Sequence, residues 1–382
     1  MSPNAKPTPA TAAPAPAPAA ELRPIPELDA AREVWPRGQR LAAVIEAGQA
    51  FKTRFKAQGM VRAARSLDLV TAPYPSTFAF HGAVRVPSAP YISITNRMIV
   101  VQYEDFGGSL RTLVWEPTVP EGSAKAPFFA QTGARIDRLP GGRWLTDRVL
   151  TEFTNDTDSA LAECGLKPAD VDFASFDHLH VQDLRMILGT TQPIPGERAP
   201  CEPLFPRAQV LAQDREVATL EDLHPMQWAW YVPGALEHTR LEQLVRLQGS
   251  VELGIGVAIV WTPGHTDGNH SLVLNTPDGV WVSSENGVSL DNWQPEQSKI
   301  PGMRHYARFY QREIVPNANT LEDVQDQYDS MVLEKTLADP CPSAPQWLQV
   351  LPSSELTSHR RQWPIRPTHR HGGIDYGRIV AQ

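Results

Sequence analysis

The chain has 382 residues, a net charge of −8 and a calculated isoelectric point of about 5.8. Hydrophobic residues make up 41% of the chain and charged residues 20%, which is typical of a globular protein with ample apolar material for a core. The acidic balance argues against nucleic-acid binding, and no window reaches the roughly 18 consecutive apolar residues of a membrane span. The three cysteines (Cys164, Cys201 and Cys341) form no C-x-x-C pair, so we expect a reduced, cytoplasmic setting.

The first part of the chain divides by composition. Residues 1–26 are an Ala/Pro-rich tract without the apolar core of a signal peptide, and we expect a disordered tail there. Residues 27–75 are predicted to be a helical N-terminal extension, because Leu41, Val44 and Ile45 recur at helical spacing and the pattern extends to about residue 69. Residues 76–382 are predicted to form the catalytic domain.

Strands and helices then alternate along the chain. From Thr77 to Thr118 the pattern is that of β-strands. The later predicted elements are a helix over 143–164, strands over 171–176 and 208–212, a Trp-rich helical region over 220–247, a strand over 257–261, a hairpin over 271–283, helices over 303–313 and 320–335, and a strand near 364–366. This order predicts a layered α/β protein with its functional loops at one rim of a sheet.

Two histidine segments follow two of these strands. His178 and His180 are one residue apart, so on an extended backbone both imidazoles point the same way. His265 follows the strand Val257–Trp261 and provides a third nitrogen at a strand end. Three protein ligands with one position left for water are the arrangement of a catalytic zinc site, in which the pKa of the bound water falls to about 7. The histidines therefore predict metal-assisted hydrolysis.

With these motifs in place, the chain resembles the metallo-β-lactamase superfamily, and within it the lactonase-like hydrolases that degrade acyl-homoserine lactones. The resemblance covers about residues 90–375 and rests on the histidine segments, on Leu204-Phe-Pro-Arg-Ala-Gln-Val and His224-Pro-Met-Gln-Trp, and on the hairpin that ends at Glu285. It implies an αββα sandwich with a one- or two-metal site at one edge of the sheets.

The sequence departs from the family's pattern at the second metal site. The usual His-x-His-x-Asp-His has Gln182 in place of the aspartate and Asp183 in place of the last histidine. The resemblance implies Asp183, Glu285 and either His369 or His371 as second-site ligands, with Gln182 as a weak oxygen donor or a hydrogen-bond donor to substrate. Without a second ion, Asp183 is a candidate general base. An oxygen-rich second site would suit Mn or Fe better than Zn.

Further candidates surround this set. His270 and His371 are candidates for metal ligation or for support of the ligands. Trp228, Trp230, Tyr231 and Trp293 lie in segments that could form the wall of a substrate pocket for a flat or acyl-bearing molecule.

The leading hypothesis is a hydrolase in which a metal-activated water attacks an electrophilic carbon of a small lactone or ester, with one or two zinc ions. Three alternatives stay open: displacement of a leaving group from an activated aromatic ring, a di-iron enzyme that reacts with oxygen, and a non-catalytic subunit with a degenerate site. We expect a small-molecule substrate, no nucleic-acid or membrane partner, and a homodimer or higher homo-oligomer.

Overall fold

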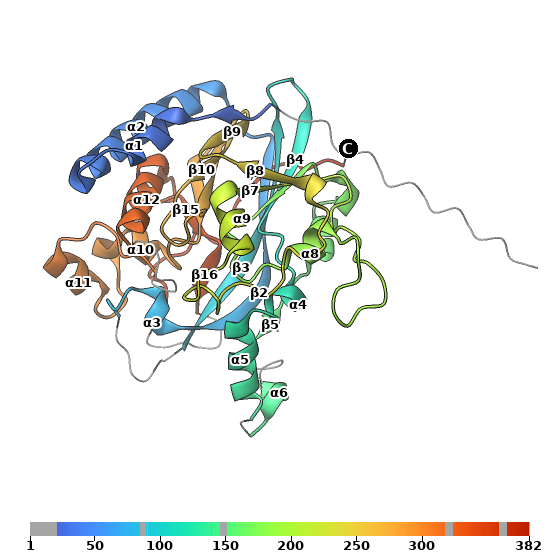
Figure 1. Ribbon diagram of the computed structural model, residues 1–382. Helices are drawn as coiled ribbons and strands as arrows, with labels where there is room; N and C mark the ends of the chain where they lie inside the picture. Colours follow the sequence, from blue (N-terminus) through green and yellow to red (C-terminus); the bar gives the residue numbers. More distant parts are fainter. Residues whose placement is uncertain are drawn as a thin grey trace, which may run out of the picture.

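The computed structural model describes residues 21–84, 89, 91–138, 140–145, 151–317, 324–358 and 365–381. In this part of the chain, two large β-sheets pack face to face and helices cover their outer sides (Figure 1). None of the described helices is long and apolar enough to cross a membrane.

The larger sheet has the strand order β17-β2-β3-β4-β6-β7-β8, with β5 paired to β2 and β16 paired to β3. Its strands are β2 (Ala63–Pro75), β3 (Tyr91–Glu104), β4 (Leu110–Trp115), β5 (Glu152–Phe153), β6 (Phe173–Ser175), β7 (Gln209–Gln213), β8 (Leu244–Leu247), β16 (Ser354–Thr357) and β17 (Asp375–Gly377). Because β4, β6, β7 and β8 are parallel neighbours, their carboxyl ends meet at one rim of the sheet.

The smaller sheet has the order β1-β9-β10-β11-β12-β15. Its strands are β1 (Arg23–Pro24), β9 (Val251–Gly254), β10 (Val257–Trp261), β11 (His270–Thr276), β12 (Gly279–Ser284) and β15 (Val350–Pro352). A separate hairpin joins β13 (Pro340–Cys341) to β14 (Ala344–Leu348).

Apolar residues on both faces of the central strands explain why these strands are covered on both sides. In β10, Val257 and Ile259 lie in the core between the sheets, whereas Ala258 and Val260 face the helices on the outer side. Successive side chains of a strand point to opposite faces, so a strand that is apolar throughout must be covered on both sides. The other central strands are buried in the same way, which gives three apolar layers between four layers of secondary structure.

Helices form the two outer layers. Against the smaller sheet pack α1 (Pro26–Arg32), α2 (Arg37–Gln58), α10 (Leu290–Trp293) and α12 (Val324–Leu337). Against the larger sheet pack α7 (Thr157–Glu163), α8 (Leu184–Leu188) and α9 (Asp214–Glu221). The remaining helices are α3 (Ser76–Ala79), α4 (Pro120–Ser123), α5 (Pro127–Ile136), α6 (Gly142–Leu145), α11 (Met303–Tyr310), η2 (Pro168–Asp170), η3 (Leu241–Gln243) and η4 (Pro295–Gln297). In Figure 1, α5 and α6 project from the body of the molecule.

The αββα sandwich expected from the sequence is therefore present, but several predicted elements differ. The helical prediction is wrong from residue 63 onward, where β2 begins and pairs along its length with β3. Residues 77–79 belong to the short helix α3 instead of a strand. In the region 220–247, α9 ends at Glu221 and β8 begins at Leu244, because Pro225, Pro233 and Gly234 interrupt a helix and β8 pairs with β7.

Two further predictions are only partly placed. The helix over 143–164 is divided into α6 and α7 with β5 between them, and residues 146–150 lie outside the described part. Residue 364 of the expected last strand also lies outside it, and the strand that is present is β17, at residues 375–377.

The predicted tail and extension belong to the sandwich where they are described. Residues 1–20 lie outside the described residues, but β1 pairs with β9, and the Ile25 side chain is fully buried. The helices α1 and α2 pack on each other and on α12. The predicted boundary between residues 75 and 76 falls at the end of β2, a strand of the larger sheet.

Candidate metal centre

The two histidine segments leave the two sheets at neighbouring points. β6 ends at Ser175 and leads to Asp177, while the turn after β10 leads through His265 to β11, which begins at His270. The His270 backbone N–H donates to the Asp177 carbonyl at 2.8 Å, so this hydrogen bond joins the two segments across the sheets. The fold thereby brings residues almost 90 positions apart to one rim.

His178, His180 and His265 converge at this rim. One nitrogen from each of the three side chains lies within 4.8 Å of the others. The ring centroids are 4.6 Å apart for His178 and His180, 4.5 Å for His178 and His265, and 5.3 Å for His180 and His265. His180 and His265 are buried, and His178 is half-buried. This is the cluster that the sequence spacing predicts.

Hydrogen bonds fix the orientation of two of these rings. The Asp177 Oδ1 accepts from His178 Nδ1 at 2.5 Å, and the Asn317 Oδ1 accepts from His265 Nδ1 at 2.9 Å. Since neither acceptor has a proton to give, each Nδ1 is the protonated nitrogen and Nε2 carries the lone pair. Asn317 is itself held, because its Nδ2 donates to the Glu285 carbonyl at 2.5 Å. Partners of this kind orient the imidazoles in metal sites of proteins.

His180 has a different environment. Both of its ring nitrogens are buried and have no hydrogen-bond partner among the described residues. Burial lowers its pKa well below the ordinary value, and burial also lowers the pKa of His265 to about 3. Buried polar groups almost always have partners, so an imidazole left without one indicates a missing ligand. Neutral imidazoles are also the form in which histidine binds a metal.

Three buried carboxylates lie behind the histidines. Burial and the nearby negative charge of Asp177 raise the pKa values of Glu116 and Glu285 well above the usual range. Burial raises the pKa of Asp177 too, but its interactions with His178, Ser353 and Glu116 together outweigh burial and lower this pKa. Glu116 also accepts a hydrogen bond from the Asp177 backbone N–H. Asp177 is therefore the ionised member that supports His178.

The predicted second-site ligands are not brought together. Asp183 caps α8, and its carboxylate accepts hydrogen bonds from Arg185 Nε at 2.7 Å and Lys125 Nζ at 3.0 Å. Both oxygens are engaged by cations, and Asp183 is not in the group of ligand atoms that cluster among the described residues. Gln182 is buried and donates to Thr118 Oγ1 at 3.3 Å.

His369 and His371 lie elsewhere. His369 stacks on Trp347 with ring centroids 5.6 Å apart, and His371 packs on Trp281 and contacts the Leu348 carbonyl. Both rings pack on tryptophans, and the Nε2 of His369 is buried without a hydrogen-bond partner among the described residues. Glu285 is buried near Asp177, but it too is outside the cluster of ligand atoms found among the described residues. Among the described residues, the predicted second-site ligands thus form no group of their own that could hold a metal ion.

The aromatic candidates divide into two groups. The ring centroid of Tyr231 is 4.8 Å from that of His180, and the ring centroid of Trp230 is 6.0 Å from it. Trp230 in turn stacks on Phe128 of α5 at 4.5 Å. Trp293, by contrast, is fully buried in the core beneath the smaller sheet, so its assignment to a pocket wall is wrong. Trp228 is half exposed.

His270 supports the site without joining the cluster. Its Nε2 donates to the Phe176 carbonyl at 2.6 Å, and its Nδ1 accepts from Gln213 Nε2 at 3.3 Å. Burial lowers its pKa to about 4, which keeps the ring neutral. His270 therefore fixes the end of the strand that precedes Asp177.

Sequence reasoning missed three residues around the histidines: Asp177, Asn317 and Glu216. Asp177 could have been found, because a carboxylate next to a predicted ligand is a ready partner for its ring. Asn317 and Glu216 left no such signal, since they come near the histidines only in the folded chain.

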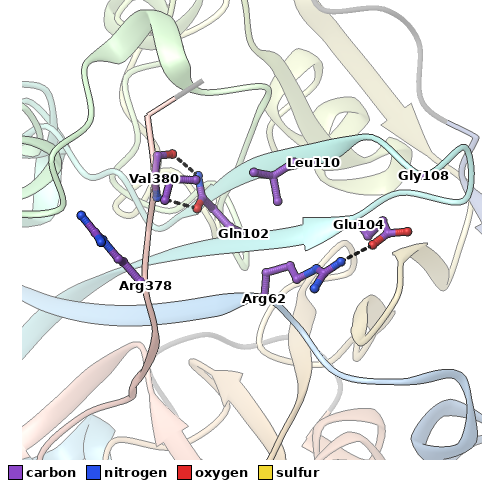
Figure 2. A pocket seen from close by; sticks show the side chains of 7 residues that line it. All are labelled: Arg62, Gln102, Glu104, Gly108, Leu110, Arg378 and Val380. Carbon is purple, nitrogen blue, oxygen red and sulfur yellow. Dashed lines mark hydrogen bonds and ion pairs between the residues drawn. The ribbon is translucent and has the colours of Figure 1, made fainter.

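A surface hollow lies elsewhere, where the C-terminal segment crosses β3 (Figure 2). The Val380 backbone exchanges two hydrogen bonds with the Gln102 side chain, at 2.7 and 2.9 Å. The residues that line the hollow are Arg62, Gln102, Glu104, Gly108, Leu110, Arg378 and Val380, and none of them was predicted as a site residue.

No family model and no curated protein matches the chain. Among solved structures, a quorum-quenching N-acyl homoserine lactone lactonase has 13% identity and a TM-score of 0.49, over 81% of this chain and 97% of that one. A probable metal-dependent hydrolase from Staphylococcus aureus has 13% identity and a TM-score of 0.48, over 71% and 83%. A dizinc quorum-quenching lactonase, AidC, has 11% identity and a TM-score of 0.47, over 85% and 97%. Two of these three solved structures are thus quorum-quenching lactonases, and the third is a probable metal-dependent hydrolase.

Proposed function

We propose that this protein is a metal-dependent hydrolase and that His178, His180 and His265 hold its metal ion. The observation that carries the proposal is His180, a member of the three-imidazole cluster whose two ring nitrogens are buried without a hydrogen-bond partner among the described residues. A bound cation would give the buried ring nitrogens of His180 a partner. The ionised carboxylate of Asp177, hydrogen-bonded to His178, would balance the charge of the cation.

Zinc is the metal we propose, because three imidazole nitrogens with an open fourth position suit it best. When bound, zinc supplies a Lewis acid and lowers the pKa of a coordinated water towards neutrality. Asp177 and Asn317 hold two of the imidazoles in the tautomer that zinc requires. We propose one ion per chain, since Lys125 and Arg185 already neutralise the carboxylate of Asp183.

For the substrate, we propose a small lactone or ester with an apolar group. The resemblance of the sequence motifs to those of lactonase-like hydrolases supports a lactone or ester bond as the one that is cleaved. The ring of Trp230 beside His180, stacked on the partly buried Phe128, supports an apolar group next to the carbonyl. Tyr231 is fully buried and is not part of this surface. The Gln182 amide, held by Thr118, is a candidate donor to a substrate oxygen.

The test is metal analysis and hydrolysis assays on the purified protein and on His180→Ala. We expect about one zinc per wild-type chain, and loss of most of the metal with a fall of more than about 100-fold in lactone or aryl-ester hydrolysis in the variant. His305→Ala, at an exposed position on α11, is the matched control and should behave as wild type.

Other results would point to other functions. Two irons per chain would favour oxygen chemistry, and a wild-type chain without metal would favour a non-catalytic role. Full metal content in His180→Ala would show that the site lies elsewhere.

A further inference from the structure

Glu216 is a buried carboxylate on α9 that no sequence motif singles out. Its side chain is 1% exposed. An unpaired carboxylate in such a place would be costly, so the groups that face it indicate what it does.

All three of its described hydrogen-bond donors belong to the histidine segments or their aromatic neighbour. Its Oε1 accepts from the Leu179 backbone N–H at 2.9 Å and from the Tyr231 hydroxyl at 2.8 Å. Its Oε2 accepts from the Thr266 hydroxyl at 2.6 Å. Leu179 lies between His178 and His180, Thr266 follows His265, and Tyr231 packs on the His180 ring.

Close packing adds to these hydrogen bonds. A Cβ at Gly268 would lie 2.3 Å from the Cβ of Glu216 and 2.4 Å from its backbone nitrogen, far inside van der Waals contact. The turn that carries His265 is therefore pressed directly against α9 at Glu216, and no larger residue fits at position 268.

We propose that Glu216 is a positioning residue, which sets the spacing between the His178–His180 loop and the His265 turn and so shapes the site for one metal ion. This inference rests on the proposed metal-binding function. One carboxylate spans the two segments, so its loss would let the third imidazole move relative to the first two. Supporting partners of metal ligands typically contribute about 10- to 100-fold to metal affinity.

The test measures metal binding, independently of catalysis. Zn²⁺ affinity would be measured by competition with a chromophoric chelator, and ligand geometry by the visible spectrum of the Co²⁺-substituted protein. We expect Glu216→Leu to bind Zn²⁺ about 10- to 100-fold more weakly and to change the Co²⁺ spectrum. Glu216→Gln should recover most of the affinity, because its amide oxygen can still accept from Leu179 and Tyr231.

Milder variants keep the test decisive if Glu216→Leu does not fold. Thr266→Val removes one hydrogen bond to Glu216 and should also weaken Zn²⁺ binding. Thr262→Val is the comparison variant, because Thr262 is equally buried in the same segment and its hydroxyl contacts Ser271 and Asn269 instead of Glu216.

The outcomes separate the two proposals. Wild-type Zn²⁺ affinity and an unchanged Co²⁺ spectrum in the folded Glu216→Leu variant, or in Thr266→Val, would overturn the role of Glu216. An equal loss of affinity in Thr262→Val would overturn it as well, since a general loosening of the turn would then explain the effect. A wild-type protein that binds no Zn²⁺ would instead refute the proposed function itself.

Discussion

Asp183 shows how much a residue's role depends on its partners. It lies at the N-terminus of α8, with Arg185 and Lys125 on its two oxygens. Burial alone would raise the pKa of Asp183, but these hydrogen bonds and charges outweigh burial and lower it. A carboxylate held in this way is a poor proton acceptor, so we infer a structural role for it.

Asp183→Asn should therefore lower the free energy of unfolding and leave the metal content of the protein nearly unchanged. We expect a loss of about 1–3 kcal/mol in the free energy of unfolding at neutral pH, because two cations lose their ionised acceptor. Thermal or denaturant unfolding would measure it, with metal counting on the same samples. A variant of wild-type stability that had lost its metal would return Asp183 to the metal site.

The loss of stability caused by Asp183→Asn should become smaller as the pH falls. An aspartate whose pKa is lower in the folded than in the unfolded state stabilises the fold above its unfolded pKa, about 3.9, and loses this contribution as the pH falls through the folded value. The stability gap between wild type and Asp183→Asn should therefore narrow below about pH 4. A gap that stays constant from neutral pH to pH 3 would contradict the ion-pair explanation.

At the scale of elements, α12 supports the metal centre from the side opposite α9. Gln327 Nε2 donates to Asn317 Oδ1 at 2.7 Å, and Ser330 Oγ donates to the Pro263 carbonyl at 2.6 Å. Glu334 accepts from four buried donors on β11, β12, the loop after β12 and α10. These residues are three and four positions apart, so they share one helix face. The His265 turn is thus held between two helices.

Two truncations of the N-terminus, one before β1 and one that removes β1, should differ in their effect on stability. Removing residues 1–20 should leave the melting temperature unchanged, because an Ala/Pro tract contributes little apolar surface. Removing residues 1–26 should cost at least about 1.5–3 kcal/mol, because Ile25 is fully buried and its N–H donates to the Ser250 carbonyl at 2.9 Å. Equal melting temperatures for the two truncated proteins would show that β1 contributes nothing to the sheet.

At the scale of the whole molecule, the metal centre joins the two sheets. His178 and His180 follow β6 of the larger sheet, and His265 follows β10 of the smaller one. A ligand that binds only the folded state stabilises it, by about 4 kcal/mol when its free concentration is about 1,000 times its Kd.

We therefore expect added Zn²⁺ to raise the melting temperature of the metal-free protein by several degrees, and a chelator to reverse the rise. Differential scanning fluorimetry at several Zn²⁺ concentrations would measure this shift. His180→Ala should show almost none of it. A similar Zn²⁺ response in His180→Ala would mean that the ion stabilises the protein from another place.

The sequence by itself determined the features that depend on local pattern. A continuous apolar run predicted β10, and a Pro-Asp-Gly turn predicted the β11–β12 hairpin. The one-residue spacing of His178 and His180 predicted that both rings point the same way. The position of His265 at a strand end was predicted for the same reason. The local pattern predicted a helix for residues 63–69, and this prediction is wrong because these residues belong to β2 and pair with β3.

Only the tertiary structure decided which distant residues meet. Asp183 pairs with Lys125, 58 positions away, a contact that the motif does not suggest. His369 and His371 pack beside Trp347 and Trp281, whereas Asn317 and Glu216 reach the histidine segments. Spacing along the chain fixes side-chain direction over a few residues. Contacts between separate elements depend on how whole layers pack, which no local pattern encodes.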